Sequence, residues 1–296
     1  MNTAPANSRP IGIRWTMGDV SDRGFEALHL SIWGAWQTFG PQAAYVVCVN
    51  TLSPAQASAR TGPVPAAVRW HDATRDMPEF LAGFFGANMA EGVGWKLAPL
   101  RFFPDRYEIS LDNDCILWEL PTSMAAWLAC EDEPAPCLMA EDVKACYGQF
   151  AVQCPREPRN AGIRGMPPGF DLAAALRGVI ATRQQQAGAP LAFTSELDEQ
   201  GLQAAALSVA CPMHAVTLEE VAVCSPFHPH LPELGRCGAH FVGLNARHIA
   251  WDYYGRPADA WMADHWQRHR PQLYRRSAAP PRPDPAASGS VHAIRR

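Results

Sequence analysis

Two aspartates separated by a single residue, Asp112 and Asp114, have the type and spacing that most directly indicate chemistry. They end the short apolar run Arg106–Asp112 and precede the apolar stretch Cys115–Trp118. A hard divalent cation is held by one or two carboxylates while it binds phosphate oxygens. An isolated D-x-D is more often a solvated acidic turn, but the flanking apolar residues favour carboxylates held against the core. We therefore expect Asp112 and Asp114 to bind Mn²⁺ or Mg²⁺, since carboxylate-rich sites accept both.

The elements around the acid pair predict how it is positioned. Ile11–Met17 has the pattern of a strand, Gly18–Gly24 of a polar turn and Phe25–Phe39 of a helix. Ala43–Asn50 is a continuous apolar run, typical of a strand buried on both faces. Alternating strands and helices predict an α/β fold with a mixed, mostly parallel sheet flanked by helices. Ligands bind beyond the carboxyl ends of the strands in such open sheets, which is where Asp112 falls.

The remaining segments extend this alternation. Strands are predicted at Val68–His71, Thr217–Val223 and His240–Leu244, and a strand pair at Asp142–Val152. Leu117–Leu128 is predicted to be a strand followed by a helix. Helices are predicted at Met77–Asn88, at Leu172–Gln185, after Thr194 or Ser195 and within Trp251–Tyr274. Loops are predicted at Thr51–Pro65 and Asn160–Pro168 from their Gly, Pro and Ser content. Asp171 is a candidate N-cap for the helix that follows it.

The length of 296 residues suits one elaborated domain. We expect a single domain at residues 11–275, a flexible N-terminus at residues 1–10 and a disordered, Pro- and Ala-rich tail at residues 276–296.

Composition excludes several functional classes. With 48% hydrophobic and 18% charged residues the chain is globular, and its net charge of -4 provides no cationic field for nucleic acid. No run approaches the ~18 apolar residues of a membrane span, and the N-terminus lacks a secretion signal. The nine cysteines include no C-x-x-C pair, as expected of buried thiols in a reducing compartment. We predict a soluble, cytoplasmic protein without a nucleic-acid partner.

The stretch Gly94–Trp118 resembles the donor-site segment of GT-A glycosyltransferases, especially the retaining, glycogenin-like family 8. A lysine upstream of the D-x-D reaches the donor in that family, and Lys96 stands at the corresponding position. Arg101 is a second candidate for the donor phosphates, because a guanidinium matches phosphate geometry. Asn113, between the two acids, is also expected among the donor-binding residues. The resemblance implies a GT-A fold over roughly Ile11–Trp251.

Three later segments match motifs of this family in the same order. Asn160–Gly162 resembles an N-[SA]-G loop, Glu199–Leu202 a D-Q-G-[IL] segment and His240–Gly243 an H-[FY]-x-G segment. The resemblance assigns substrate binding to Asn160, Gly162 and Gly243, contact with the transferred sugar to Glu199 and Gln200, and the third metal ligand to His240. The turn that begins with Thr16, Met17 and Gly18 would hold the nucleotide base and ribose.

The chain departs from the family pattern at two places. Glu199 stands where the family usually has Asp, and the adjacent Asp198 is an alternative for that role. The Lys and Pro-Trp pair that usually follow the histidine motif are missing, and Arg247 is the candidate replacement for that Lys on the diphosphate.

The resemblance implies transfer of a hexose-type unit from a nucleoside diphosphate sugar to an unidentified acceptor, with retention of anomeric configuration. Two alternatives stay open. One is a binding protein that keeps the scaffold without transfer activity, and the other is a nucleotidyltransferase, which would prefer a Gly-rich basic loop after the first strand.

Overall fold

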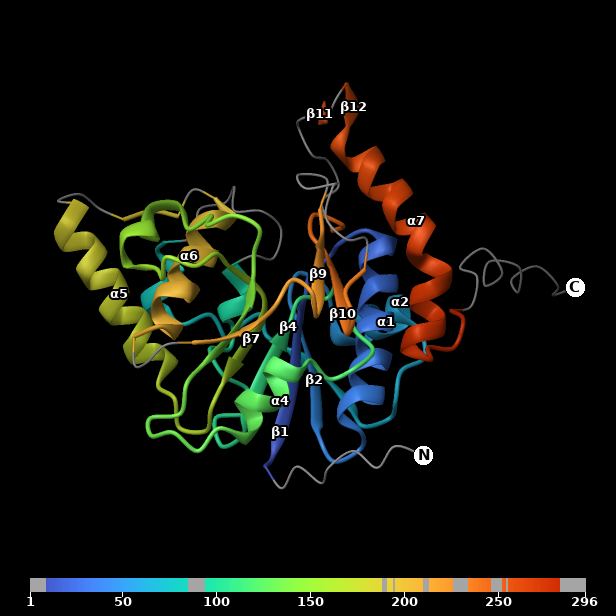
Figure 1. The fold of residues 1–296 in the computed structure, drawn as a ribbon, viewed down its shortest axis with the longest axis horizontal. Coiled ribbons are helices and arrows are strands. Elements are labelled where there is room, and N and C mark those ends of the chain that lie inside the picture. Colours follow the sequence, from blue (N-terminus) through green and yellow to red (C-terminus); the bar gives the residue numbers. More distant parts are fainter. Residues whose placement is uncertain are drawn as a thin grey trace, which may run out of the picture.

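A computed structural model describes residues 9–84, 94–187, 191–193, 195–209, 213–225, 234–245, 252–253 and 255–282. Its largest sheet consists of β1 (Ile11–Met17), β2 (Ala44–Val49), β3 (Val68–Asp72), β4 (Tyr107–Leu111), β6 (Leu138–Glu141), β7 (Arg159–Met166) and β8 (His214–Val216). The strand order is β3-β2-β1-β4-β7-β6-β8, and β7 is antiparallel to both of its neighbours (Figure 1). The predicted α/β fold with a mixed, mostly parallel sheet is confirmed.

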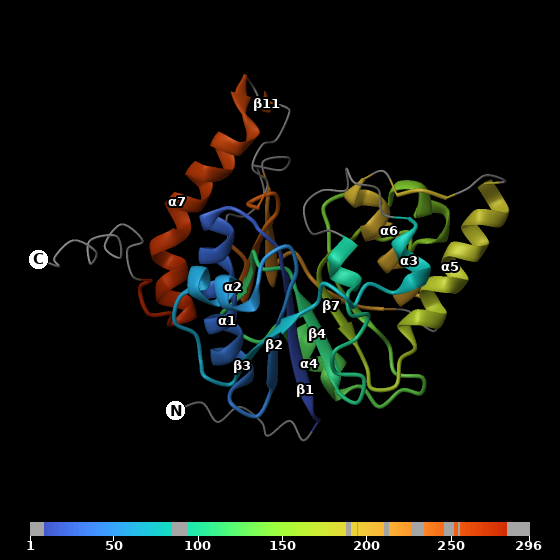
Figure 2. The same cartoon turned by 180° about the vertical axis from the view of Figure 1, so that it is seen from behind.

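Helices cover both faces of this sheet. α1 (Asp22–Phe39) and α7 (Ala258–Ser277) lie on one side, and α5 (Leu172–Ala187) and α6 (Glu196–Leu207) on the other (Figures 1 and 2). A three-stranded sheet of β5 (Cys115–Leu117), β10 (Gly238–Phe241) and β9 (Val221–Cys224) contacts α1. The remaining elements are α2 (Pro54–Thr61), α3 (Glu79–Ala82), α4 (Thr122–Ala129), the short 3₁₀ helices η1 (Gly94–Leu97) and η2 (Gly148–Gln153), and the paired β11 (Asp252–Tyr253) and β12 (Arg256–Pro257).

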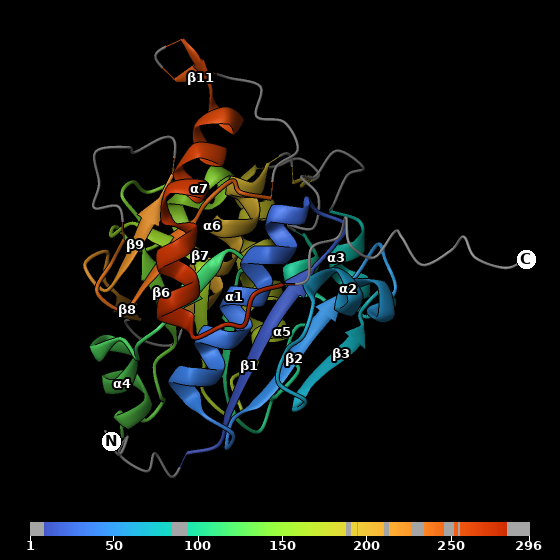
Figure 3. The same ribbon diagram turned by 90° about the vertical axis from the view of Figure 1, so that its right-hand side faces the viewer.

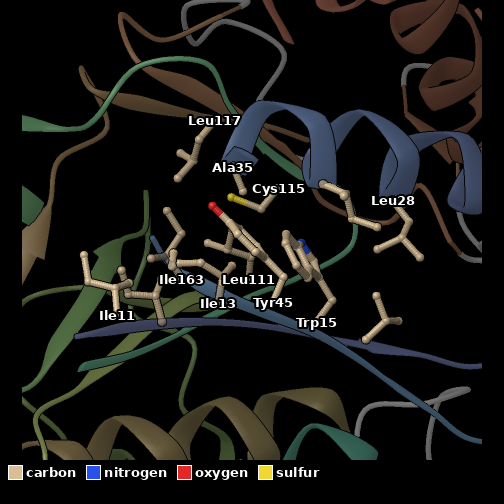
Figure 4. Close-up of a cluster of buried hydrophobic side chains, with 14 of the residues drawn as sticks. Ile11, Ile13, Trp15, Leu28, Ala35, Tyr45, Leu111, Cys115, Leu117 and Ile163 are labelled. Atoms are coloured by element: carbon tan, nitrogen blue, oxygen red, sulfur yellow. The ribbon is translucent and has the colours of Figure 1, made fainter. Parts of the chain in front are cut away.

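The two faces of the central strands differ in chemistry. Alternate side chains such as Ile13, Trp15 and Tyr45 are fully or almost fully buried and form an apolar cluster that includes Leu28 of α1 (Figure 4). The opposite face of β1 and β4 carries buried charge instead, since Arg14 lies 3.5 Å from Glu108. A strand buried on both faces is usually apolar on both. The buried charged layer formed by Arg14 and Glu108 is therefore an exception on β1 and β4.

One segment predicted to be a loop, Thr51–Pro65, contains the helix α2. Ser53 caps it, accepting a hydrogen bond from the Gln56 N–H while the Gln56 side chain accepts from the Ser53 N–H. Pro54 occupies the first helical position, where its missing N–H costs nothing. The Pro and Ser that suggested a loop are therefore helix-start residues.

Four further predictions were wrong in whole or in part. Asn160–Pro168 is mostly strand β7, because the glycines of this segment permit close packing instead of a turn. The strand pair predicted at Asp142–Val152 is absent there, because β6 ends just before this segment and η2 occupies its second half. The predicted strand at Thr217–Val223 is shifted to β9, and only residues 79–82 of the helix predicted at Met77–Asn88 are helical among those described.

The helical predictions in the C-terminal half are confirmed. Asp171 caps α5 by accepting from the Ala174 N–H, and α6 begins directly after Ser195. The start of the predicted tail is helical, because α7 extends to Ser277. Residues 278–282 also lie on the domain, with the Pro280 carbonyl 2.9 Å from His29 Nε2. Residues 283–296 lie outside the described ranges.

Among the described residues, no helix combines the length and the apolar composition that crossing a membrane requires.

A buried carboxylate, Glu26, holds α7 against α1. It accepts hydrogen bonds from Arg270, Tyr274 and Trp266, at 2.8, 2.8 and 3.2 Å. Burial raises the pKa of Glu26, but these hydrogen bonds and the Arg270 charge outweigh it and lower the pKa below its usual value. A carboxylate with a lowered pKa stabilises the fold above its unfolded pKa, and this stability is lost as the pH falls through the folded pKa.

We therefore expect Glu26→Gln to lower the free energy of unfolding by about 1–3 kcal/mol at pH 7, because charge-assisted hydrogen bonds are replaced by neutral ones. The difference from wild type should shrink as the pH falls below 4. Urea denaturation at pH 7 and at a pH below 4 measures this difference, with the exposed Glu131→Gln as control. Equal loss at both pH values would show that packing rather than charge matters.

Candidate functional site

The candidate site lies at one edge of the main sheet. β1, β2 and β4 are parallel and end there, whereas the antiparallel β7 begins there. This arrangement brings Gly18, Asp112 and Asn160 to the same edge although they are far apart in the sequence. It is the carboxyl edge, where ligands bind in open α/β sheets.

The acid pair lies in a tight turn, as sharing of a cation requires. The Cys115 N–H donates to the Asp112 carbonyl at 3.0 Å, which closes the turn between β4 and β5. Two further bonds fix it to neighbouring strands: the Asp112 N–H donates to the Gly162 carbonyl at 2.8 Å, and the Phe241 N–H to the Asp114 carbonyl at 3.0 Å.

His240 completes a three-residue group with the two acids. Its Nε2 lies 3.3 Å from Asp114 Oδ1 and 3.7 Å from Asp112 Oδ2. One ligand atom from each residue lies within 4.8 Å of the others. Although burial lowers the pKa of His240, the Asp114 and Asp112 carboxylates raise it above its usual value.

These three residues fit a divalent cation. Asp114 is almost fully buried, and its Oδ1 faces His240 Nε2 at 3.3 Å, so an oxygen and a nitrogen ligand lie together at a polar, enclosed position. Two carboxylates and an imidazole match the oxygen and nitrogen preferences of first-row divalent cations, and carboxylates suit Mn²⁺ and Mg²⁺.

Lys96, on η1, is in direct contact with this group. Its Nζ lies 2.6 Å from Asp112 Oδ2. Burial lowers the pKa of Lys96, but the Asp112 and Glu199 carboxylates raise it above its usual value. Arg14 fixes the backbone at this point, because its guanidinium donates to the Lys96 carbonyl at 3.0 Å and to the Leu100 carbonyl at 3.3 Å.

Three consecutive polar residues of α6, Asp198, Glu199 and Gln200, make different contacts. Asp198 accepts from the Gln149 N–H at 2.9 Å and so caps η2. Gln200 accepts from the Ala161 N–H at 3.2 Å and donates to the Cys146 carbonyl at 3.0 Å, which occupies both ends of its amide.

Glu199 is the carboxylate of α6 that faces the site. It is 2% exposed, and its Oε1 has no hydrogen-bond partner among the described residues. Burial raises the pKa of Glu199 to about 7 against the opposing charges of Lys96 and Arg164. The geometry therefore favours Glu199 over Asp198 for a role at the site.

Strand β7 contributes Asn160, Gly162 and Arg164, alternate residues of one strand. Asn160 accepts from the Gly162 N–H at 2.8 Å and donates to Asp142 at 3.0 Å. Arg164 is 5% exposed, donates to Gln203 and acts electrostatically on Asp112 and Glu199. Sequence reasoning missed Arg164, although reading the segment as a strand would have placed it beside Asn160 and Gly162.

Other expected residues support the backbone of the site. Asn113 and Asn245 exchange amide hydrogen bonds of 2.9 and 2.7 Å, and Asn113 also donates to the Gly24 carbonyl at 3.0 Å. Asn245 was not predicted. Gly243 has φ +85°, a conformation that favours glycine, in the turn after β10. Arg247 lies outside the described residues.

At the end of β1, Met17 and Gly18 are buried and Thr16 is partly exposed. The Met17 side chain belongs to the apolar cluster under α1, so its backbone is the part available to a ligand. A Cβ on Gly18 would lie 2.9 Å from Asn50 Oδ1, so a larger residue at this position would displace the Asn50 side chain.

Arg101 does not join the site. Its guanidinium donates to the carbonyls of Pro167, Phe170, Phe103 and Arg106, between 2.9 and 3.2 Å. These bonds tie the segment before β4 to the end of β7. Its expected role on donor phosphates is therefore replaced by a structural one.

The fold and the acid turn at its edge define the GT-A class of architecture, and solved structures agree. The structure is similar to a galactosyltransferase, LgtC, in complex with donor and acceptor sugar analogues, with a TM-score of 0.55, 11% identity and coverage of 95% of this chain and 100% of that one. An active-site mutant of LgtC gives a TM-score of 0.50 at 12% identity, covering 90% and 99%.

The apo structure of the bifunctional glycosyltransferase WbbM gives a TM-score of 0.51 at 14% identity over 92% of this chain, which spans only 52% of that longer protein. No protein-family model matches the sequence, and no curated protein matches it significantly. At this level of identity the likenesses show a shared GT-A fold.

Gly162 is expected to be essential for the metal group. A Cβ at this position would lie 2.2 Å from His240 Cε1 and 2.5 Å from its Nδ1, so Gly162→Ala must displace the imidazole. We expect Mn²⁺ affinity to fall by about 10–100-fold, as when a ligand-orienting residue is lost, while the protein stays folded. Isothermal titration with Mn²⁺ measures this.

The matched control is Gly178→Ala on the exposed face of α5, where a Cβ would meet nothing within 4 Å. Unchanged Mn²⁺ affinity in Gly162→Ala would remove His240 from the metal group.

Glu199 gives a prediction of opposite sign to that of Glu26. A carboxyl whose pKa rises to about 7 binds a proton in the folded state between its unfolded and folded pKa values, so stability falls as the pH rises through that window. We expect Glu199→Gln to stabilise the ligand-free protein by up to about 3 kcal/mol at pH 8 and little at pH 4. Thermal unfolding at the two pH values tests this; a loss of stability at pH 8 would contradict it.

Proposed function

We propose that this protein is a metal-dependent glycosyltransferase that moves a sugar from a nucleoside diphosphate sugar to an acceptor. The observation that carries the proposal is the convergence of Asp112, Asp114 and His240 with Lys96 at the carboxyl edge of a GT-A sheet. A cation group beside a lysine suits a ligand that carries adjacent phosphates.

Each residue of the group has a proposed role. Asp112, Asp114 and His240 hold Mn²⁺ or Mg²⁺, which when bound stabilises the negative charge of the departing diphosphate. Lys96 supplies a second positive charge to that diphosphate, and such fixed charge acts strongly in an enclosed site. Glu199 accepts hydrogen bonds from the transferred sugar, because its carboxylate is buried and Oε1 has no partner among the described residues.

The finer assignments rest on the resemblance to glycogenin-like enzymes. They comprise a hexose-type donor, retention of configuration and an acceptor that is a glycan, a protein or a small molecule. Asn160 and Gly162 line the sugar site in this proposal, and Thr16 to Gly18 the nucleotide site. Proton NMR of the product, once an acceptor is known, reports the anomeric configuration directly.

Calorimetry with a panel of UDP-, GDP- and other nucleotide sugars, with and without Mn²⁺, tests the proposal. We expect one class of donor to bind only with Mn²⁺. The double variant Asp112→Asn with Asp114→Asn removes two proposed metal ligands. It should weaken that binding by more than the roughly 10–100-fold that is lost when a residue that only orients a metal ligand is replaced. The exposed Asp132→Asn is the control.

The outcomes separate the alternatives. Donor binding that is unchanged without Mn²⁺ and unchanged in the double variant would contradict the metal-dependent mechanism. No binding of any nucleotide sugar to the folded wild type would favour a scaffold without transfer activity. Release of pyrophosphate from a nucleoside triphosphate would identify a nucleotidyltransferase.

A further inference from the structure

Residues 18–21, between β1 and α1, form a short loop at the carboxyl edge of the sheet, called here the donor loop because the proposed function places the nucleotide there. One arginine of α2, Arg60, fastens it. Its guanidinium donates to Asp19 Oδ1 at 2.6 Å and to the Val20 carbonyl at 2.8 Å. It also donates to Asp22 Oδ1 at 3.0 Å and lies 4.0 Å from the centroid of the Phe25 ring.

The turn after β2 holds the same loop from a second side. Thr51 accepts from the Asp19 N–H at 2.8 Å and has φ +57°. A β-branched residue is strained in this region of backbone conformation. The donor loop therefore depends on contacts from outside itself, and a strained turn supplies one of them.

The C-terminal segment, residues 278–282, crosses α1 and then reaches Arg60 and the start of α1 (Figure 3). Arg282 donates to the carbonyl of Arg60 and, at 3.4 Å, to that of Asp22. His29 of α1 lies 2.9 Å from the Pro280 carbonyl, which fixes the middle of the segment. Pro280 and Pro281 restrict its backbone. The segment thus connects the end of α7 to the backbone of Arg60 and to that of Asp22, one of the two aspartates that Arg60 contacts.

We propose that the C-terminal segment is a strap that holds Arg60 on the donor loop, and that Arg60 and Arg282 are positioning residues for the nucleotide. Asp19 and Asp22 are 51% and 83% exposed in their side chains. Arg60 offsets the negative charge of both carboxylates. Without Arg60 that charge would repel an anionic ligand at the donor loop and so weaken its binding. The strap therefore sets both the shape and the charge of the loop. This inference rests on the proposed function.

Amide hydrogen exchange of the ligand-free protein tests the strap without any donor. Arg282→Ala, and a chain ending at Ser277, should exchange about three- to fivefold faster at residues 19–25, as expected when an exposed charge-assisted contact is lost. A chain ending at Arg282 and the full chain with Arg275→Ala, an exposed arginine of the last turn of α7, should match wild type. Unchanged exchange in both strap variants overturns the proposal.

Donor binding tests the second half of the inference. The affinity of the nucleotide sugar should fall by about three- to fivefold in Arg282→Ala and further in Arg60→Met, with kcat unchanged, because neither residue is placed at the reacting atoms. Faster exchange with unchanged donor affinity overturns the link between strap and nucleotide. If wild type binds no nucleotide sugar, the proposed function fails, and the exchange result alone decides whether the strap holds the loop.

Discussion

The constraint on which the structure depends is the meeting of three distant backbone segments at Gly162. The Asp112 N–H bonds to its carbonyl at 2.8 Å, and the His240 ring occupies the space in which a Cβ would lie. The main sheet and the sheet containing β10 must therefore stay in fixed relation. Gly34 of α1 serves the same end, since a Cβ there would lie 1.9 Å from the Leu117 carbonyl of β5. Close helix packing against β5 keeps β10 where His240 can reach the acids.

Beneath this edge the charged layer on β1 and β4 has a positioning role. Arg14 and Glu108 are 1% and 0% exposed, and burying a charge is costly unless it is paired and hydrogen-bonded. Arg14 forms bonds to the carbonyls of the segment that presents Lys96, and Glu108 accepts from the Phe102 and Phe103 N–H groups. The layer thus anchors an irregular segment to the sheet, so that one lysine points at Asp112.

The sequence predicted the acid turn well because an apolar run that ends abruptly in two acids has a direct structural consequence. It predicted poorly where one residue type serves two purposes. Glycine at 162 suggested a turn, yet its function is to admit His240. Pro54 suggested a loop, yet it begins a helix. Arg101 had the chemistry for a phosphate, and only its three-dimensional contacts show that carbonyl groups occupy it. Such meetings of distant segments are not encoded in local patterns.

Two buried side chains near the carboxyl edge, Glu199 and Asn50, carry polar atoms without a hydrogen-bond partner among the described residues. They are Oε1 of Glu199 and both amide atoms of Asn50, the residue that follows β2. Each such group costs about 1–3 kcal/mol in the ligand-free fold. In the proposed function a sugar hydroxyl and the nucleotide are the groups that would satisfy them. A protein with no ligand would gain stability if apolar residues replaced these two, so their burial near the proposed site agrees with the proposed binding of a ligand.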